Sequence, residues 1–491
     1  MIIKIFILSL KYIMRSIDNY IEYLKDYQRL PVEFIKNNYG LILFHSTGAG
    51  KTVTSLVSMY QFDKHIVIIG PKSSKKAFED EISKLKMDQT NFTMYTYSKI
   101  KKEMYTNMEL LKDKCVIVDE AHNLRNETRD NMFLTGIFSF ANKVMLLTAT
   151  PVINYINDIS PLINIVKQDD ILPTERHLFN FFYFDEDNIR ILNADLLRNK
   201  LKNAISYYEK DDKENYPEWG IIEKKVVMNE EQVKEYERYV KKIIFYEQVP
   251  PEGAAIFEFD FDKISKKHKN AFLTATRQIS NVASDDELSP KIVDIVDIVR
   301  KGPFPAVIYS NYLNRGVYPI AKLLDQYNVS YKMITGNTNH DKLIKIVNDY
   351  NSRKFDILLL SSAGSESLDL KNTRQLHITE PTWNDPRIDQ VIGRTIRYKS
   401  HNDLPLNERN VTIYKWVSIF NKEKIHNLSA DEYLIDISNK KRKLFDTFKE
   451  LIIESSIEMQ QTNKNVMNRM MKFHKKEYEK YAKLYQSLIK K

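Results

Sequence analysis

The segment 44–52, FHSTGAGKT, combines small residues, a lysine and hydroxyls in a spacing suited to holding phosphate. Gly48 and Gly50 allow the backbone to curl so that successive N–H groups point toward one anion. Lys51 can reach the β- and γ-phosphates of a nucleotide, and the Thr52 hydroxyl can hold Mg²⁺. The segment therefore predicts a phosphate-binding loop that takes ATP with Mg²⁺.

The loop departs from the strict phosphate-loop pattern at His45, where that pattern has glycine. A glycine-rich turn before a helix is the alternative interpretation of the same residues. Upstream of the loop, the amide of Gln28 could pair with the donor and acceptor edges of adenine, or it could be a solvated residue at a helix end. The expected ATP contacts are Gln28, Thr47, Gly48, Ala49, Gly50, Lys51 and Thr52.

Two carboxylates directly follow an apolar run in the segment 115–122, CVIVDEAH. Removing two charges from water at the end of a buried strand is costly. A bound Mg·ATP would explain both, because Asp119 could orient the metal or its water and Glu120 could polarise the attacking water. An Asp-Glu pair after a strand is often a plain loop, but after a phosphate loop it indicates a hydrolytic site.

Polar residues also follow two other apolar runs of the first half. Lys72 comes after 65–70, HIVIIG, and could contact a nucleic-acid phosphate. Thr148 and Thr150 end the segment 144–151, VMLLTATP, and could sense the γ-phosphate. Ordinary strand-to-helix turns would carry the same residues, so both assignments stay open here.

In the second half, the segment 390–397, QVIGRTIR, places Arg394 and Arg397 three residues apart, which is one face of a helix. Two guanidinium groups could stabilise charge on a transferring phosphoryl group, with Gln390 beside them. An exposed basic helix is the alternative. The hydroxyls of Thr338 and Ser362 follow two further apolar segments and are candidates for coupling to nucleic acid.

The elements that must position these groups alternate between apolar strands and helices. Apolar runs at 41–44, 65–70, 115–118 and 144–148 predict a doubly wound parallel α/β sheet with its chemistry at the carboxyl ends of the strands. A second α/β pattern begins at Lys291. The expected divisions are an extension at 1–13, an ATP-binding domain at 14–165, a mainly helical insertion at 166–290, a second domain at 291–425 and a basic helical tail at 426–491.

Composition limits the class of protein. The chain has 491 residues with 43% apolar side chains, and 74 basic against 65 acidic residues give a formal charge of +9, which suits a polyanion. Its one cysteine, Cys115, allows no disulfide within the chain and no Cys-based zinc site, and it favours a reducing intracellular compartment. The apolar stretch 2–10 is too short to span a membrane, so we expect a soluble protein without a membrane partner.

The ordered segments HSTGAGKT, VIIGPKSS, DEAH, TATP, 363–370 and QVIGRTIR resemble the motifs of superfamily two helicases and translocases of the DEAD/H type. The resemblance runs from about residue 28 to 397. It implies two RecA-like parallel-sheet domains with ATP between them and nucleic acid across both. The segment TATPVINYINDISPLINIV resembles the remodeller-type branch, which generally moves on duplexes without melting them.

GRTIRYKSH, with 431–434 and the Lys-rich helix after it, is similar to ATPases of nucleocytoplasmic large DNA viruses, the group of the poxvirus nucleoside triphosphate phosphohydrolase and early transcription factor small subunit. This implies a nucleic-acid-dependent ATPase that moves on DNA or RNA in viral transcription, in host cytoplasm or virion. The alternative is a subunit of an initiation or termination factor in which ATP acts as a switch. Expected partners are DNA or RNA and a viral RNA polymerase or a second factor subunit.

Overall fold

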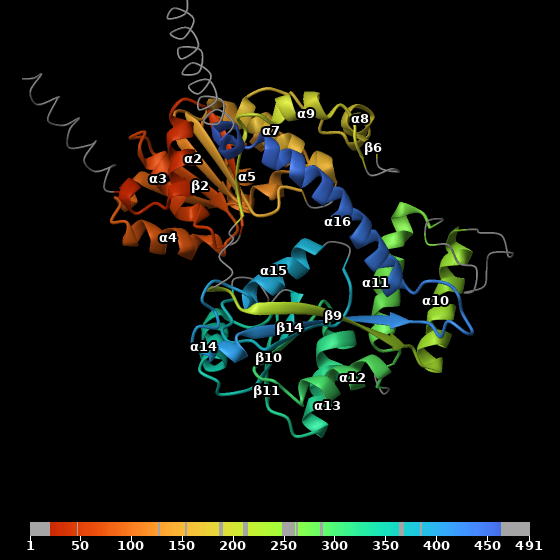
Figure 1. The fold of residues 1–491 in the computed structure, drawn as a ribbon. Coiled ribbons are helices and arrows are strands. Elements are labelled where there is room, and N and C mark those ends of the chain that lie inside the picture. Colours follow the sequence, from red (N-terminus) through yellow and green to blue (C-terminus); the bar gives the residue numbers. More distant parts are fainter. Residues whose placement is uncertain are drawn as a thin grey trace, which may run out of the picture. The chain divides into compact units, whose positions relative to one another are not determined.

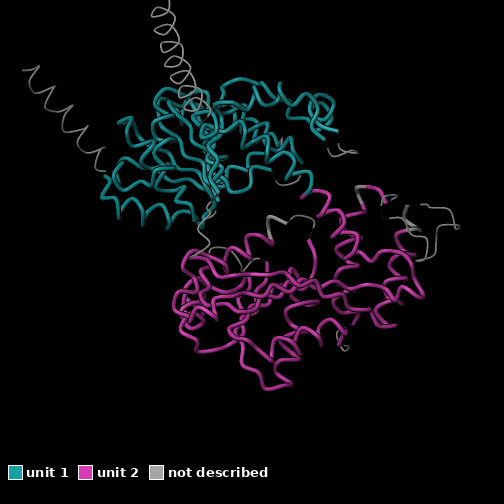
Figure 2. Tube along the Cα trace, in the orientation of Figure 1, with its two compact units in different colours: residues 1–210, 443–491 teal, residues 211–442 magenta. Residues whose placement is uncertain are grey.

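The chain forms two compact units, residues 1–210 with 443–491 and residues 211–442, and each is described by itself (Figure 2). In this computed structural model, the expectations for 1–13, Thr47, most of 363–370 and the end of the tail lie outside the described residues. The residues that the structure describes are 20–46, 48–125, 128–152, 155–185, 190–209, 215–247, 261, 264–284, 288–362, 368–382 and 385–462.

Unit 1 contains a six-stranded sheet in which every neighbouring pair of strands is parallel (Figure 1). This confirms the predicted doubly wound architecture. Two parallel strands cannot be joined by a tight turn, so the chain must cross over between them, and helices form these crossovers. The strands in sheet order are β3 (Phe92–Thr96), β2 (Ile66–Gly70), β4 (Cys115–Asp119), β5 (Lys143–Thr148), β1 (Gly40–His45) and β8 (Ile205–Tyr208).

Helices cover both faces of this sheet, which explains why β1 is buried along its whole length. One face carries α2 (Asp26–Lys36), α3 (Lys51–Tyr60) and α4 (Ser74–Lys84), whose apolar residues form one core with alternate residues of the strands. The other face carries α5 (Tyr97–Glu103), α6 (Arg129–Ile137), α7 (Ser160–Lys167), α8 (Arg176–Tyr183) and α9 (Ala194–Leu201). A short antiparallel hairpin, β6 (Phe184–Asp185) with β7 (Arg190–Ile191), lies between α8 and α9 along the chain.

Unit 2 contains a second six-stranded sheet, also parallel at every pair. Two cores lie on its faces and a third surrounds α10, α11 and the start of α16. The strands in order are β11 (Tyr331–Ile334), β12 (Ile357–Ser361), β10 (Ala306–Ser310), β13 (Gln375–Ile378), β14 (Asn410–Ile419) and β9 (Glu218–Val227). The helices are α10 (Glu230–Glu247), α11 (Lys266–Asn281), α12 (Pro290–Val299), α13 (Tyr318–Gln326), α14 (His340–Asn351), α15 (Asp385–Thr395) and α16 (Ala430–Ser455).

The region 166–290, expected as a mainly helical insertion, supplies an edge strand to each sheet. β8 pairs with β1 in unit 1, and β9 pairs with β14 along its full length in unit 2. β9 lacks a strand-like apolar alternation because its side chains are mostly exposed, Trp219 by 56%. Among the described residues, no helix is both long and apolar enough to cross a membrane.

The C-terminal part of the described chain returns to unit 1. From residue 443 onward it belongs to that unit, where Phe448, Leu451 and Ile452 join the core on the α5–α9 face. Ile457 joins the core on the opposite face. Residues far apart in sequence therefore build one domain, and residues 448–457 contribute to its cores.

Candidate nucleotide site

The segment between β1 and α3 has the geometry of a phosphate-binding loop. Gly48 and Gly50 adopt φ angles of 76° and 73°, in the left-handed region that favours glycine. A Cβ atom on Gly50 would lie 2.6 Å from Nε2 of Gln28, so a larger residue would displace the Gln28 amide as well as strain the backbone. α3 begins at Lys51, directly after the loop, and its N-terminal N–H groups can bind an anion.

The Lys51 ammonium contacts the backbone of the loop and interacts electrostatically with Asp119 and Glu120. Its Nζ donates to the backbone carbonyls of His45, at 2.8 Å, and Ser46, at 3.2 Å. Burial lowers the pKa of the Lys51 ammonium, while the charges of Glu120 and Asp119 act in the opposite direction. The lysine and both carboxylates are therefore close enough to form one charged site.

Strand register explains this convergence. Phe44 of β1 pairs with Thr148 of β5, and Leu147 pairs with Asp119 of β4, so three neighbouring strands end side by side. The end of β2 is also near, because a Cβ atom on Gly70 would lie 3.2 Å from Cβ of Asp119. The predicted chemistry at the carboxyl edge of the sheet is thus assembled from four strands.

Glu120 occupies a constrained backbone position with a reachable carboxylate. Its φ angle is 50°, and its carbonyl accepts hydrogen bonds from Tyr97 Oη at 3.0 Å and Asn123 Nδ2 at 3.0 Å. The Tyr97 hydroxyl also lies 2.8 Å from the carbonyl of Asp119. The Glu120 side chain is 39% exposed, which allows a water molecule to approach it. Sequence reasoning missed Tyr97, for which no motif gives a signal.

His122 links the acid to the hydroxyls at the end of β5. Its Nδ1 lies 3.3 Å from Oε2 of Glu120 and 3.3 Å from Oγ1 of Thr148. Oγ1 of Thr148 accepts a hydrogen bond from the N–H of Thr150 at 3.0 Å. Burial, assisted by the charge of Arg125, lowers the pKa of His122 to about 4, so the ring is neutral. His122 was within the DEAH signal but received no predicted role.

Gln28 is buried against the loop, with 4% of its surface exposed, so the alternative of a solvated helix-end residue is wrong. Its Nε2 donates to the carbonyl of Gly50 at 3.2 Å and to Oγ1 of Thr54 at 3.0 Å. Its Oε1 accepts from the N–H of Lys25 at 2.9 Å, at the start of α2. Gln28 thus supports the loop backbone, and its contact with adenine stays a prediction.

The structure also gives the positions of Ala49 and Lys72, which were expected at this site. Ala49 is buried, and its carbonyl accepts from the Tyr27 hydroxyl at 2.9 Å. Lys72 is exposed after β2. No group of three or more His, Cys, Asp or Glu in the described part of the chain could hold a metal by itself. Thr52 and Asp119 offer the oxygen ligands that suit Mg²⁺ arriving with a nucleotide.

The predicted arginines lie in unit 2, and the expected shared helix face is wrong. α15 ends at Thr395, so Arg397 follows the helix, and its backbone N–H donates to Oγ of Ser400 at 3.2 Å. Nη1 of Arg397 lies 3.3 Å from Oδ1 of Asp369, and its Nε donates to the carbonyl of Gly393 at 2.8 Å. Arg394 is half-buried in the last turn of α15.

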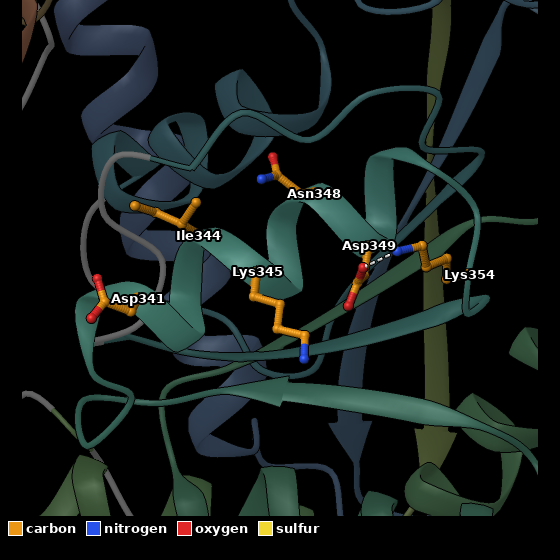
Figure 3. Close-up of a pocket in the computed structure, with 6 residues that line it drawn as sticks. All are labelled: Asp341, Ile344, Lys345, Asn348, Asp349 and Lys354. Carbon is orange, nitrogen blue, oxygen red and sulfur yellow. Dashed lines mark hydrogen bonds and ion pairs between the residues drawn. The ribbon is translucent and has the colours of Figure 1, made fainter.

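The remaining candidates of unit 2 lie on different elements. Gln390 is exposed on α15, and Ser362 follows β12. Oγ1 of Thr338 accepts from the N–H of Thr335 at 3.0 Å, which closes a turn before α14. A surface hollow on α14 involves none of the predicted residues and carries an Asp349–Lys354 ion pair of 2.7 Å (Figure 3).

Two family models match successive parts of the chain. Residues 64–287 match the family described as SNF2-related domain, and residues 290–399 match the helicase conserved C-terminal domain. A protein of Acanthamoeba polyphaga mimivirus named as an ATP-dependent RNA helicase is 51% identical over 89% of this chain and 98% of its own length.

Two further relatives are more distant. An African swine fever virus protein named termination factor NPH-I homolog is 24% identical over 86% of this chain and 76% of its own. Nucleoside triphosphatase I of Heliothis armigera entomopoxvirus is 24% identical over 88% of this chain and 79% of its own. The chain is therefore similar to viral proteins with related names along most of its length.

Proposed function

The chain belongs to the SNF2-related helicase family of nucleoside triphosphatases, and from that premise we propose that it couples ATP hydrolysis to movement along DNA or RNA. The observation that carries the proposal is the convergence of Lys51, Asp119 and Glu120 beside a loop with two left-handed glycines. Such an arrangement binds phosphate and supplies a base for water.

In the proposed reaction the loop N–H groups and Lys51 hold the β- and γ-phosphates. Thr52 and Asp119 would hold Mg²⁺, which would supply positive charge to the phosphate oxygens. Glu120 orients water and accepts its proton as the water oxygen bonds to the γ-phosphorus. The bond from phosphorus to the bridging oxygen then breaks, and ADP leaves with that electron pair.

The hydrogen-bonded sequence Glu120, His122, Thr148 and Thr150 supports a route from hydrolysis to conformational change. A water molecule held by Glu120 would alter the contact between Glu120 and His122. The Thr148 hydroxyl contacts the same Nδ1 atom of His122, so its own hydrogen bond would change as well. We propose that this route couples ATP hydrolysis to movement on nucleic acid. Lys72, Thr338 and Ser362 are the residues proposed to face the nucleic acid. Gln390, Arg394 and Arg397 are proposed to stabilise the transferring phosphoryl group.

The names of the relatives favour a task in viral transcription. One relative is named a termination factor homolog and another a nucleoside triphosphatase. We therefore propose that the chain acts with a viral RNA polymerase or a second factor subunit in infected cells, in host cytoplasm or virion. The second candidate function is a switch subunit, in which ATP binding and hydrolysis change an assembly without movement along a strand.

The testing experiment is a steady-state ATPase assay of the full chain with single-stranded and duplex DNA and RNA as separate activators. We expect at least one activator to raise turnover, and Lys51→Ala to abolish it. Displacement of a triplex-forming strand by the isolated chain would support the translocase, and activation without displacement would support the switch. Absence of ATP hydrolysis with every activator would contradict both candidates.

A further inference from the structure

The C-terminal segment 456–462 holds the edge strand of the unit-1 sheet through a glutamate. Oε1 of Glu458 accepts a hydrogen bond from Oγ of Ser206 at 2.5 Å. Its Oε2 accepts from the backbone N–H of Tyr207 at 2.9 Å, a donor on the open side of β8. Ile457 fixes the segment because its side chain is buried in the unit-1 core. One carboxylate therefore satisfies two adjacent donors of β8.

Ser206 continues this contact to the residue that ends β1. Oγ of Ser206 lies 2.8 Å from Nε2 of His45, and both side chains are fully buried. The carbonyl of His45 is also the closer of the two acceptors of Lys51 Nζ. Hydrogen bonds thus link Glu458 to Ser206 and Ser206 to the ring of His45, and the carbonyl of His45 accepts from Lys51 in the phosphate loop.

We propose that Glu458 is a positioning residue for the phosphate loop. Through Ser206 it sets the tautomer of His45, and it thereby fixes the end of β1, whose carbonyl accepts from Nζ of Lys51. The inference rests on the proposed function, because it takes this loop to be the ATP-phosphate site. It also gives a role to His45, the residue by which the loop departs from the strict glycine pattern.

The protonation state of the Glu458 carboxyl decides which ring nitrogen of His45 carries the proton. Ser206 has one hydroxyl proton, and an ionised Glu458 can only accept, so it takes that proton. His45 must then carry its proton on Nε2 and donate to Ser206, which leaves Nδ1 as an acceptor. If Glu458 is protonated it donates to Ser206, Ser206 donates to Nε2, and the histidine proton lies on Nδ1. The number of protons on His45 is the same in both cases.

The surroundings of His45 allow this change without a change of charge. Burial and the nearby Lys51 charge lower the pKa of His45 to about 3, so the ring is neutral in either tautomer. The rings of Tyr27 and Tyr208 contact it edge-on at centroid distances of 6.2 and 5.9 Å, which restrains its orientation. Among the described residues, Nδ1 of His45 is buried without a hydrogen-bond partner.

The test compares Glu458→Gln with Glu454→Gln in the full chain. Glu454 is a matched control, because it lies four residues earlier, is exposed and pairs with Arg198 at 2.8 Å. A glutamine at position 458 can accept from Tyr207 only through its oxygen, so its NH₂ group donates to Ser206. The readouts are the ¹⁵N NMR shifts of the His45 ring, which distinguish the tautomers, and the KM and kcat for ATP.

We expect Glu458→Gln to move the proton of His45 from Nε2 to Nδ1 at pH values above the Glu458 pKa. We also expect the KM for ATP to rise roughly three- to tenfold, the equivalent of about one hydrogen bond, with a smaller change in kcat. Glu454→Gln should change neither quantity. In a Ser206→Ala background, Glu458→Gln should add no further increase in KM.

An unchanged His45 tautomer in Glu458→Gln, or equal KM values for the two glutamine variants, would overturn the inference. If Glu458→Gln does not fold, the wild-type chain gives the same test, because acidification through the raised pKa of Glu458 should move the proton to Nδ1. If the tautomer moves but the wild-type chain hydrolyses no ATP, the proposed function fails while the link from Glu458 to His45 stands.

Discussion

Nδ1 of His122 lies 3.3 Å from Oε2 of Glu120, and the same nitrogen lies 3.3 Å from the Thr148 hydroxyl. The residue proposed to activate water and the residue proposed to sense its effect therefore share one ring nitrogen. Because the ring is buried and neutral, it transmits hydrogen bonding and not charge. This relationship connects the chemistry of β4 to the end of β5 within a single unit.

Removal of the base should separate binding from hydrolysis. Glu120→Gln keeps the size and polarity of the side chain but cannot accept the proton of water, so we expect kcat to fall roughly 100-fold or more with little change in ATP affinity. Glu109→Gln, an exposed residue paired with Lys112, is the control. Fluorescent-nucleotide binding and phosphate release measure the two quantities. Full turnover in Glu120→Gln would show that another group activates the water.

Replacement of Gly50 by alanine tests the phosphate-loop assignment, and the same replacement at a helical glycine serves as the comparison. Gly50→Ala places a Cβ atom 2.6 Å from Nε2 of Gln28 at a φ of 73°, so we expect the loop to distort and ATP affinity to fall at least tenfold. Gly136→Ala is the control, because Gly136 lies in α6 with no atom within 4 Å of the new Cβ. That control should stabilise unit 1 by up to about 1 kcal/mol. Equal nucleotide affinities in the two variants would contradict the loop assignment.

The strand ends of unit 1 could be predicted from sequence because their signals are local. Asp119 and Glu120 directly follow one continuous apolar run, Gly50 and Lys51 lie in the loop that follows another, and parallel strands bring their carboxyl ends to one edge. The support of the loop was not local. Ser206 and Glu458 reach His45 from more than 150 residues away along the chain, and no spacing rule connects them.

The edge strands and the end of α15 were less predictable for different reasons. β9 mixes glycine and charges with apolar residues, because an edge strand with exposed side chains carries no buried face to set a pattern. The segment around Arg397 has a helical spacing, but the Arg394 carbonyl accepts from the backbone N–H of Leu370 at 3.1 Å. The N–H of Arg397 donates to Oγ of Ser400 at 3.2 Å, so the helical bonding does not continue. In both cases contacts formed only in the folded chain decided the local structure.

The neutral His122 should make stability depend on acid pH. Its pKa is lowered to about 4 in the folded chain but is near 6.5 when unfolded, so the unfolded state binds more protons between these values. Stability from this group is present above about pH 6.5 and is lost as pH falls toward 4, by at most about 3 kcal/mol. Urea unfolding across this range should give a shallower pH dependence for His122→Asn. Identical slopes in the two proteins would contradict the neutral buried ring.

A buried ion pair fixes the start of α16 in unit 2. Nζ of Lys291 lies 2.9 Å from Oδ2 of Asp431, with side-chain exposures of 1% and 0%. Asp431→Asn would leave the lysine without its carboxylate partner, so we expect a loss of about 3–5 kcal/mol in the unfolding free energy of the full chain. Asp436→Asn, whose exposed carboxylate pairs with Lys440, should cost less than about 1 kcal/mol. Denaturant titration measures both. Similar losses in the two variants would contradict a stabilising pair.

The role of Arg397 in hydrolysis can be separated from its role in unit 2. In the structure its guanidinium lies 3.3 Å from Asp369, an exposed pair that contributes little to stability. If Arg397 stabilises charge on the transferring phosphoryl group, Arg397→Ala should lower kcat roughly 100-fold or more, with ATP affinity and melting temperature nearly unchanged. Arg300→Ala, which removes a comparable partly exposed pair with Asp297, is the control and should keep full turnover. Asp369→Asn tests the purely structural alternative, because it breaks the same ion pair while retaining the guanidinium. Turnover lost equally in Arg397→Ala and Asp369→Asn would assign Arg397 to the fold of unit 2 and remove it from the hydrolytic site.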